Sequence, residues 1–426
     1  MTNKWTCVLL KTTRKSRSKG GVHMSTTLLY HGFGIHGYQY VHTKYHHGAI
    51  HFRVRQEVFN LRCPVCGSSK VRRRGQVMRR FRTVPIGPRP VWIELLVPRV
   101  FCHLCGIIRQ VRVRFAFRRR SYTRAFERYA LELSQHMTIK DVARHLGVSW
   151  DVIKDIQKRN LMRRFAFPQF HKLKQIAIDE ISIGKGHRYL TIVLDLKSGA
   201  VVYVGEGKGA EALKRFWKIL KRQKVHIEAV ATDLSPAYIS AVHSHLPKAV
   251  HVFDHFHLIK LFNDGLSDLR RKLYHEAERM QRHVLKGSRW LLLKNPENLD
   301  PKYREHERLA AALELNQPLA LAYYMKEDLR QIWMQSDKTT ATKILHDWVH
   351  RAFASGISML IKFAKTVAMY RSGILAFYDY PISTGPLEGT NNKIKTMKRQ
   401  AYGFRDLEFF KLKILALHNA KYALVG

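Results

Sequence analysis

Apolar and polar positions follow three successive patterns along the chain. Residues up to about 118 carry β-like runs, with strands expected at 71–74, 76–84 and 91–101. Helical spacing then takes over, and beyond Pro168 runs of strand and helix alternate. This order predicts a multidomain α/β protein in which a β-rich module and a helical module precede a sheet domain.

The helical module has the pattern of a helix-turn-helix. One amphipathic helix is expected over 122–134, and a second begins after the N-cap Thr138 and ends at Gly147. Ser149 then caps a third helix, so two short helices are joined by a turn that contains glycine. The second helix of such a pair enters the major groove of DNA, whereas an ordinary helical hairpin has no such role. The exposed candidates for DNA contact on this helix are Trp150, Asp151, Lys154 and Lys158.

Beyond Pro168 the strand and helix runs occur in the order βββαβαβ, which is that of a ribonuclease-H-like domain. Residues 263–380 are helical by pattern, and a stretch of this length predicts a large helical insertion in the sheet domain. Its tryptophans Trp290, Trp333 and Trp348 are expected in the core; the alternative is that they stack on an unpaired base. The expected strands cover 175–181, 189–196, 200–204, 227–232 and 249–253, and the expected helices cover 210–222 and a segment from Ser235.

Composition adds a strong positive charge to this picture. The 426 residues hold 75 Lys and Arg against 32 Asp and Glu, and residues 1–170 hold 34 against 7. Binding to nucleic acid best accounts for this density of positive charge, because Lys and Arg side chains that contact the phosphates release their counterions. The alternative is a solvated basic face or attraction to an anionic lipid surface. No run of 18 apolar residues occurs, and the N-terminal segment lacks the apolar stretch of a signal peptide. We therefore expect a cytoplasmic protein with no membrane partner.

Four of the five cysteines form two CxxC pairs, Cys63 with Cys66 and Cys102 with Cys105. Each pair can place two thiolates on one tight turn, and two such turns make a tetrahedral zinc site. Disulfides are the alternative, which a cytoplasmic location disfavours. We therefore expect these four residues to bind a structural Zn²⁺, while Cys7 has no evident partner.

Three acidic residues fall where a metal site of the sheet domain would form. Asp179 lies within the first strand and Asp233 at the carboxyl end of the fourth, and neighbouring strands bring such residues side by side. Glu388 lies near the start of an expected helix, whose same face carries Asn392 and Lys395. Such a constellation predicts two Mg²⁺ (or Mn²⁺) ions, roughly 3.5–4 Å apart, that promote in-line displacement at a phosphodiester.

Other residues compete for these roles. Glu180 follows Asp179 directly, but neighbouring residues of a strand point to opposite faces of the sheet. Asp195 also ends a strand and is the second choice for an active-site acid. The run from Asp254 to His257 follows a strand, and we expect it to support the site or contact DNA, with plain core packing as the alternative. The glycines at 205–209 lack the P-loop pattern, so no nucleotide cofactor is expected.

Taken together, these motifs resemble those of the ISL3-type family of insertion-sequence transposases, which use an Asp-Asp-Glu triad. The resemblance implies that Asp179, Asp233 and Glu388 are the catalytic carboxylates, that the cysteine pairs belong to an end-recognition module, and that the reaction is DNA strand cleavage and joining. It also adds Lys398 and Arg399 to the expected DNA contacts. The motifs that carry it are Tyr30-His-Gly-Phe-Gly-Ile, the two cysteine pairs, Ile178-Asp179-Glu180, Thr232-Asp233-Leu234-Ser235, Phe253-Asp254-His255-Phe256-His257, Glu388-Gly-Thr-Asn-Asn-Lys-Ile-Lys and Lys398-Arg399-Gln-Ala-Tyr402-Gly403-Phe404.

The family typically starts near the position of Met24, so residues 1–23 are expected to be an upstream extension. The further modules are expected at 24–118 (β-rich, zinc-binding), 119–168 (helix-turn-helix), 169–262 with 381–426 (ribonuclease-H-like, catalytic) and 263–380 (helical insertion). We predict a bacterial, nucleoid-associated DNA transposase that binds double-stranded DNA at transposon ends and target, and assembles as a homodimer or larger because two ends must meet. The alternative is a DNA-binding regulator with the same zinc ribbon and helix-turn-helix and a catalytically dead transposase-like domain; a phosphatase or RNA nuclease on this fold is a third.

Overall fold

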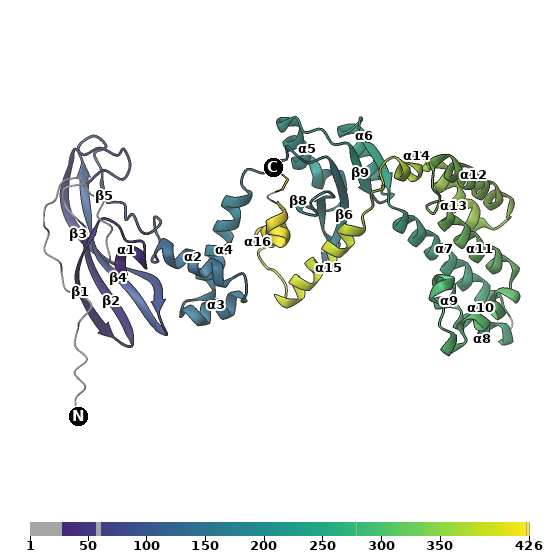
Figure 1. The fold of residues 1–426 in the computed structure, drawn as a ribbon, viewed down its shortest axis with the longest axis horizontal. Helices are drawn as coiled ribbons and strands as arrows, with labels where there is room; N and C mark the ends of the chain where they lie inside the picture. Colours follow the sequence, from purple (N-terminus) through teal and green to yellow (C-terminus); the bar gives the residue numbers. More distant parts are fainter. Residues whose placement is uncertain (1–27, 57–60, 278, 423, 426) are drawn as a thin grey trace, which may run out of the picture. The chain divides into compact units, whose positions relative to one another are not determined.

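A computed structural model of the protein describes residues 28–56, 61–277, 279–422, 424 and 425 (Figure 1). It divides into two units, Met1–Asn160 and Leu161–Gly426, which are described separately below. The expected extension at 1–23, the expected family start at Met24 and the lone Cys7 lie outside the described residues. No helix in the described part of the chain is long and apolar enough to cross a membrane.

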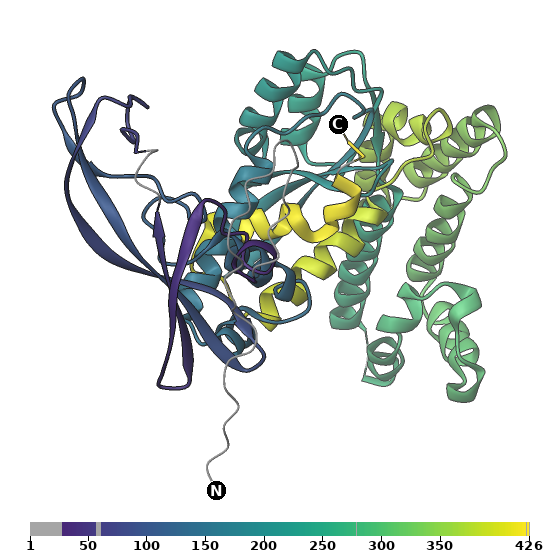
Figure 2. The ribbon, with the colours of Figure 1, turned by 60° about the vertical axis from the view of Figure 1, so that its left-hand side comes forward.

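A five-stranded sheet forms much of the first unit (Figure 2). Its strands follow the order β1-β2-β4-β3, and β5 pairs with β4. One face of the β3–β4 hairpin covers a core that contains Phe81, Ile93 and Leu95, while Arg72–Arg74 of β3 are exposed. The elements are α1 (Leu28–His31), β1 (Tyr38–His46), β2 (Ala49–Gln56), β3 (Val71–Ile86), β4 (Arg89–Cys102) and β5 (Ile108–Gln110).

Three helices follow this sheet along the chain and confirm the predicted helix-turn-helix: α2 (Arg124–Leu133), α3 (Ile139–Leu146) and α4 (Trp150–Phe165), which continues past Asn160. The side chain of Thr138 caps α3, and Gly147 ends it with a left-handed φ of 61°. Ile153 of α4 is buried in a core shared by the three helices. Arg82 of β3 is also buried and donates a hydrogen bond to the carbonyl of Leu146 (2.8 Å), so the sheet and the helices form one packed body.

The second unit contains a five-stranded sheet in the order β10-β9-β6-β7-β8. β6, β9 and β10 are parallel, and β7 and β8 extend the sheet as antiparallel strands. This is the predicted βββαβαβ topology of a ribonuclease-H-like domain. The elements are β6 (Gln175–Gly184), β7 (Arg188–Asp195), β8 (Val201–Glu206), α5 (Ala210–Gln223), β9 (Ala229–Thr232), α6 (Pro236–His245) and β10 (Val250–Phe253).

Helices cover both faces of this sheet. α5 and α6 pack on one face, and the C-terminal helices α15 (Gly385–Gln400) and α16 (Leu407–Leu415) pack on the other. Alternate residues of β6 divide between the two cores: Ile178 packs towards α5 and α6, whereas Ala177 and Ile181 pack with α15. Asp179 therefore shares the α15 face, and its neighbour Glu180 faces α6. Within the described residues, η5 (Ala416–His418) and α17 (Asn419–Tyr422) follow α16.

A helical insertion lies between β10 and α15, as predicted, and α7 leads into it from the sheet (Figure 1). Trp348 is fully buried in its core and donates a hydrogen bond to the carbonyl of Met325 (2.7 Å), and Trp333 packs against the same core. The expectation of a buried tryptophan is wrong for Trp290, which is 65% exposed beside Arg289. The helices are α7 (His255–Glu276), α8 (Arg279–Gly287), α9 (Arg289–Leu293), η2 (Pro296–Asn298), η3 (Pro301–Tyr303), α10 (Glu305–Glu314), α11 (Gln317–Gln331), α12 (Lys338–Ala354), α13 (Ser358–Met369), α14 (Arg371–Leu375) and η4 (Ala376–Tyr378).

Candidate active site and cysteine cluster

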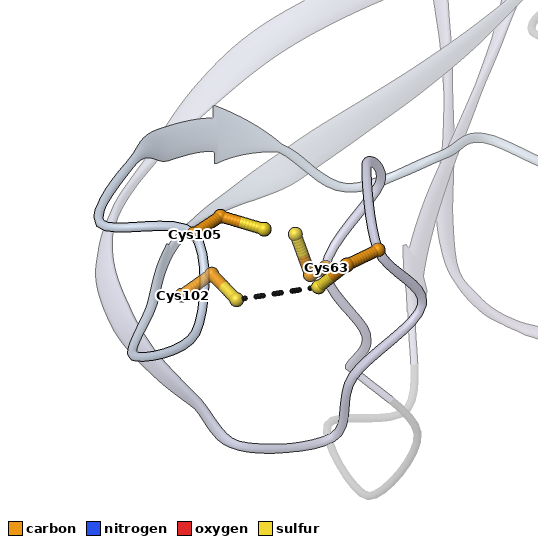
Figure 3. Close-up of side chains that lie close together, drawn as sticks. Cys63, Cys102 and Cys105 are labelled. Atoms are coloured by element: carbon orange, nitrogen blue, oxygen red, sulfur yellow. Dashed lines mark hydrogen bonds between the residues drawn. The ribbon is translucent and has the colours of Figure 1, made fainter.

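The four paired cysteines converge, and their sulfur atoms all lie within 4.8 Å of one another (Figure 3). Both pairs form the same turn: the amide of Gly67 donates to the carbonyl of Cys63 (3.0 Å), and the amide of Gly106 donates to that of Cys102 (2.9 Å). Gly67 and Gly106 have φ values of 76° and 64°, which glycine adopts without steric strain. Two equivalent turns therefore present the four sulfur atoms to one point.

This geometry fits a tetrahedral zinc ion. With Zn–S bonds of about 2.3 Å, neighbouring sulfur atoms should lie about 3.8 Å apart, and those of Cys66 and Cys102 are 3.6 Å apart. All four cysteines are free of disulfides. Backbone amides, first that of Cys66, lower the pKa of Cys63 to about 6, whereas the crowding sulfur of Cys66 raises the pKa of Cys105 to about 12. A divalent cation would allow all four to be thiolates, so the cluster supports a structural zinc site.

Three adjacent strands of the second sheet carry aspartates towards one region of the sheet. Asp179 lies in β6, Asp233 directly follows β9, and Asp254 directly follows β10. The parallel register pairs Ala177 with Ala231, so Asp233 falls on the same face as Asp179. Burial raises the pKa of Asp179 and of Asp233, and the charge of Asp233 raises the pKa of Asp179 further. The two predicted carboxylates therefore lie close enough to repel each other.

Asp254 joins this region to the start of α15. Its carboxylate accepts hydrogen bonds from the hydroxyl of Thr384, the N-cap of α15, and from Nδ1 of His257 (2.9 Å). Burial opposes ionisation of Asp254, but these hydrogen bonds hold its pKa below the usual range. The bond to Asp254 also raises the pKa of His257, with smaller contributions from Asp179 and Asp233. The run from Asp254 to His257 therefore makes polar contacts beside Asp179 and Asp233 and is not purely core packing.

Asn391 is the site residue that the sequence did not single out. Its Nδ2 donates a hydrogen bond to Oδ2 of Asp179 (2.9 Å), while the amide of Glu180 donates to Oδ1 (2.7 Å). Its own Oδ1 is buried and has no hydrogen-bond partner among the described residues. Leu387, Asn391 and Ile394 form the buried stripe of α15. A polar residue on an apolar stripe was the signal that could have identified it.

Glu388, Asn392 and Lys395 share one face of α15, as predicted, and all three are exposed. Glu388 does not form a compact trio with Asp179 and Asp233. Within the described ranges, the four cysteines are the one group of three or more His, Cys, Asp or Glu residues whose ligand atoms all lie within 4.8 Å of each other. The structure therefore brings two of the three predicted carboxylates together and leaves the third on the outer face of the adjacent helix.

The competing acids have other roles. Asp195 is buried and accepts hydrogen bonds from the amides of Lys197 and Ser198. It pairs with Ile176, near the start of β6, whereas Gly184 is at the other end of that strand. It therefore shapes the turn between β7 and β8. Glu180 faces the other side of the sheet, where its carboxylate lies against the hydroxyl of Tyr238 and helps burial to raise the pKa of that tyrosine.

The predicted DNA contacts lie on two helices. Trp150 is 54% exposed at the start of α4, and the ammonium of Lys154 lies 5.8 Å from the centre of its ring. Lys158 is half-buried one turn further along α4. Near the end of α15, Lys395 and Arg399 are exposed, and Lys398 is half-buried.

Comparisons with known families match three segments of the chain. Residues 176–414 match the transposase family of the ISL3 DDE type, and residues 111–159 match the helix-turn-helix domain of transposase family ISL3. Residues 60–105 match the zinc finger of the transposases IS204/IS1001/IS1096/IS1165. The three matches follow the order of the cysteine cluster, the helix-turn-helix and the sheet domain.

Individual relatives span most of the chain. The transposase for insertion sequence element IS1001 of Bordetella parapertussis is 33% identical over 358 residues, which cover 83% of this chain and 88% of that protein. The transposase for insertion sequence element IS1557 of Mycobacterium tuberculosis is 28% identical over 394 residues, which cover 86% and 87%. Among solved structures, the Drosophila P element transposase strand transfer complex matches 72% of this chain and 94% of its own, at a TM-score of 0.38 and 12% identity.

Proposed function

The chain belongs to the ISL3 family of DDE transposases, and we propose that it cleaves and joins DNA at the ends of a bacterial insertion sequence with Asp179, Asp233 and Glu388 as its catalytic carboxylates. One observation carries this proposal: Asp179 and Asp233 lie side by side on the α15 face of the sheet, with pKa values raised by burial. Two such carboxylates are costly to ionise together unless a cation lies between them. The pair is therefore suited to a divalent metal.

The residues fit Mg²⁺ or Mn²⁺, which prefer oxygen ligands. When bound, a pair of such ions activates the attacking hydroxyl or water and stabilises the leaving oxygen of the phosphodiester. Asp179, Asp233 and Glu388 would hold the ions. Glu388 need not touch Asp179 directly, because carboxylates that hold a pair of ions can bind different members of the pair.

Other residues would hold these carboxylates in place. The hydrogen bond from Asn391 fixes the orientation of Asp179. The bond from Thr384 to Asp254 attaches the start of α15, and hence Glu388, to the end of β10. His257 donates a hydrogen bond to Asp254, and the charges of Asp179 and Asp233 help to raise its pKa. Asn392 and Lys395 lie on the same exposed face as Glu388 and are available to the phosphate backbone.

The N-terminal modules would locate the DNA ends. We infer that the cysteine cluster holds Zn²⁺ and stabilises an end-recognition module, and that α4 reads the major groove through Trp150, Lys154 and Lys158. Lys398 and Arg399 would contact the DNA backbone near the catalytic site. Two ends must meet for strand transfer, so the active form is a homodimer or larger assembly, acting on the bacterial chromosome in the cytoplasm.

The decisive experiment uses linear duplex DNA that carries the inverted repeats flanking the coding sequence. In Mg²⁺ or Mn²⁺ the purified protein should nick these ends. Asp179→Ala, Asp233→Ala and Glu388→Ala should each reduce cleavage by roughly a thousandfold or more, because each removes a carboxylate that would hold the catalytic metal ions. End binding in an electrophoretic shift should stay within about twofold, because the proposed contacts to the DNA bases are made by α4 and not by these carboxylates.

Asp264→Ala is the matched control, because Asp264 is an exposed acid on α7 of the same unit. It should cleave at the rate of the unsubstituted protein. Binding to the repeats without strand cutting in either metal would instead support a regulator with an inactive transposase domain.

A further inference from the structure

A basic pocket with a fully exposed tyrosine lies at the end of α15. The pocket has a volume of about 510 Å³, within the range of sites that bind small molecules. Tyr402 is 101% exposed, the highest value among the exposed large apolar residues of the described chain. The residues that line the pocket are Ser182, Lys395, Lys398, Arg399, Tyr402 and Gly403.

The turn that follows α15 holds Tyr402 away from the protein. Tyr402 and Gly403 both adopt left-handed conformations, with φ values of 51° and 94°. Their amides donate hydrogen bonds to the carbonyls of Arg399 (3.0 Å) and Lys398 (2.9 Å), which closes the end of the helix. A bulky residue rarely adopts this conformation, and here it fixes an aromatic ring in solvent rather than in a core.

The charge of the pocket selects an anion. Three of its six lining residues are cationic and none is acidic. Lys395, Lys398 and Arg399 form no ion pair with any residue in the described part of the chain, so their charges are available to a ligand. A free aromatic face beside several cations is the arrangement that binds single-stranded nucleic acid, in which a base stacks on the ring and cations contact the phosphates. Bases within a duplex are already stacked and would not offer a free face.

The pocket lies a short way from the proposed catalytic carboxylates. Ser182 follows Asp179 by three residues of β6, which is about 10 Å along a strand. Lys395 follows Glu388 by seven residues of α15, which is also about 10 Å along a helix. At about 3.4 Å per stacked nucleotide, this separation corresponds to roughly three nucleotides.

We propose that this pocket takes one unpaired nucleotide of the DNA strand, about three positions from the phosphodiester that is cut, with its base stacked on Tyr402 and its phosphates near Lys398 and Arg399. The distance of three positions rests on the proposed function, because it assumes that the DNA is cut at Asp179, Asp233 and Glu388. The pocket itself follows from the exposed ring, the three cations and their common location.

Photocrosslinking tests the pocket without any cleavage. The full chain is mixed, in the absence of divalent metal, with a ten-nucleotide single strand of thymidines that contains one 5-iodouracil. Irradiation should attach the probe to Tyr402, as mapped by peptide mass spectrometry. Tyr402→Ala should remove this adduct and weaken binding roughly ten- to a hundredfold, the loss expected for one stacked base.

Two variants separate stacking from other causes. Tyr402→Phe keeps the aromatic face and should bind as the unsubstituted chain does. Tyr303→Ala is the matched control, because Tyr303 is 60% exposed in the same unit and lies beside Lys302; it should leave binding unchanged. Equal weakening by Tyr402→Ala for single-stranded and duplex probes would overturn the proposal, as would a principal adduct elsewhere, for example on Trp290.

The outcome is independent of catalysis. Crosslinking at Tyr402 in a protein that cuts no DNA would leave the pocket standing and refute the transposase chemistry. Efficient end cleavage with no adduct at Tyr402 would refute the pocket alone. A thermal midpoint for Tyr402→Ala equal to that of the unsubstituted chain would verify that the variant is folded.

Discussion

His251, in β10, shows how one buried side chain sets the response to acid. The hydroxyl of Thr232 lies 2.7 Å from the carbonyl of Asp233 and 2.8 Å from Nε2 of His251, so Nε2 has a hydrogen-bond partner. Nδ1 of His251 is buried and has no hydrogen-bond partner in the described structure. Protonation there would place an uncompensated charge in the core, and burial lowers the pKa of His251 to about 4.

This residue predicts a loss of stability in mild acid. The unfolded chain takes up the proton near pH 6.5 and the folded chain near pH 4, so the contribution of neutral His251 is complete above pH 6.5 and is lost as the pH falls towards 4. The free energy of unfolding should fall by roughly 1–3 kcal/mol more in the unsubstituted chain than in His251→Gln between pH 7 and 4.5. Urea unfolding at a series of pH values measures this difference. The exposed His226, changed to Gln, is the control and should behave as the unsubstituted chain; parallel pH profiles for all three proteins would contradict the assignment.

The two cysteine turns act as one structural element. The pairing of Val71 with Cys102 brings the two turns together, and a shared metal ion should fix their four sulfur atoms at one point. We expect one zinc per chain by elemental analysis, and its loss in Cys66→Ser or after chelation. Zinc loss should weaken end binding at least tenfold while the unfolding transition of the second unit shifts little, because that unit has its own cores.

Cys7→Ser is the control for this experiment, because Cys7 belongs to neither pair. It should retain zinc and end binding. Simultaneous collapse of both units on chelation would argue against independent modules.

α15 and the turn after it carry several of the second unit's candidate functional residues. The inner stripe of α15 carries Asn391 to Asp179, its outer face carries Glu388, and the turn that follows it presents Tyr402. The helical period predicted that Glu388, Asn392 and Lys395 share a face. It did not predict which face meets the sheet, because that depends on the packing of Leu387 and Ile394 against the apolar residues of β6.

At the scale of the whole molecule, the net charge of +43 predicts strongly salt-dependent binding of duplex DNA. The exposed Arg72, Arg73 and Arg74 of β3 lie in the unit with the greater excess of cations. Changing all three to Gln should reduce the slope of log affinity against log salt by about 2–3, because each phosphate contact contributes about 0.9. Fluorescence anisotropy of a labelled duplex between 50 and 200 mM NaCl, conditions over which counterion release is pronounced, measures the slope.

A second triple variant controls for the change in net charge. Lys343, Lys362 and Lys365 are exposed on α12 and α13 of the insertion. Their replacement by Gln should leave the slope nearly unchanged if the first unit makes the duplex contacts. Equal effects of the two triple variants would mean that the charge acts as a whole and not through the first unit.

The sequence by itself determined the order of the modules and most of their local structure. Several features depend only on residues that are close in the chain, so they can be predicted without knowledge of the tertiary structure. They include helix caps such as Thr138, the glycine of each cysteine turn, and the alternation that places Asp179 and Glu180 on opposite faces. The spacing of the cysteines likewise predicted a four-sulfur cluster, because one tetrahedral metal ion takes two sulfur ligands from each turn.

Only the tertiary structure decided which of several adjacent polar residues meet at the site. It selected Asn391 rather than Asn392 as the partner of Asp179, joined Asp254 to Thr384 across 130 positions, and left Glu388 facing outwards. A periodic pattern fixes which side chains share a face, but the direction of that face is set by packing against elements that are distant in sequence. Such contacts depend on the fold as a whole.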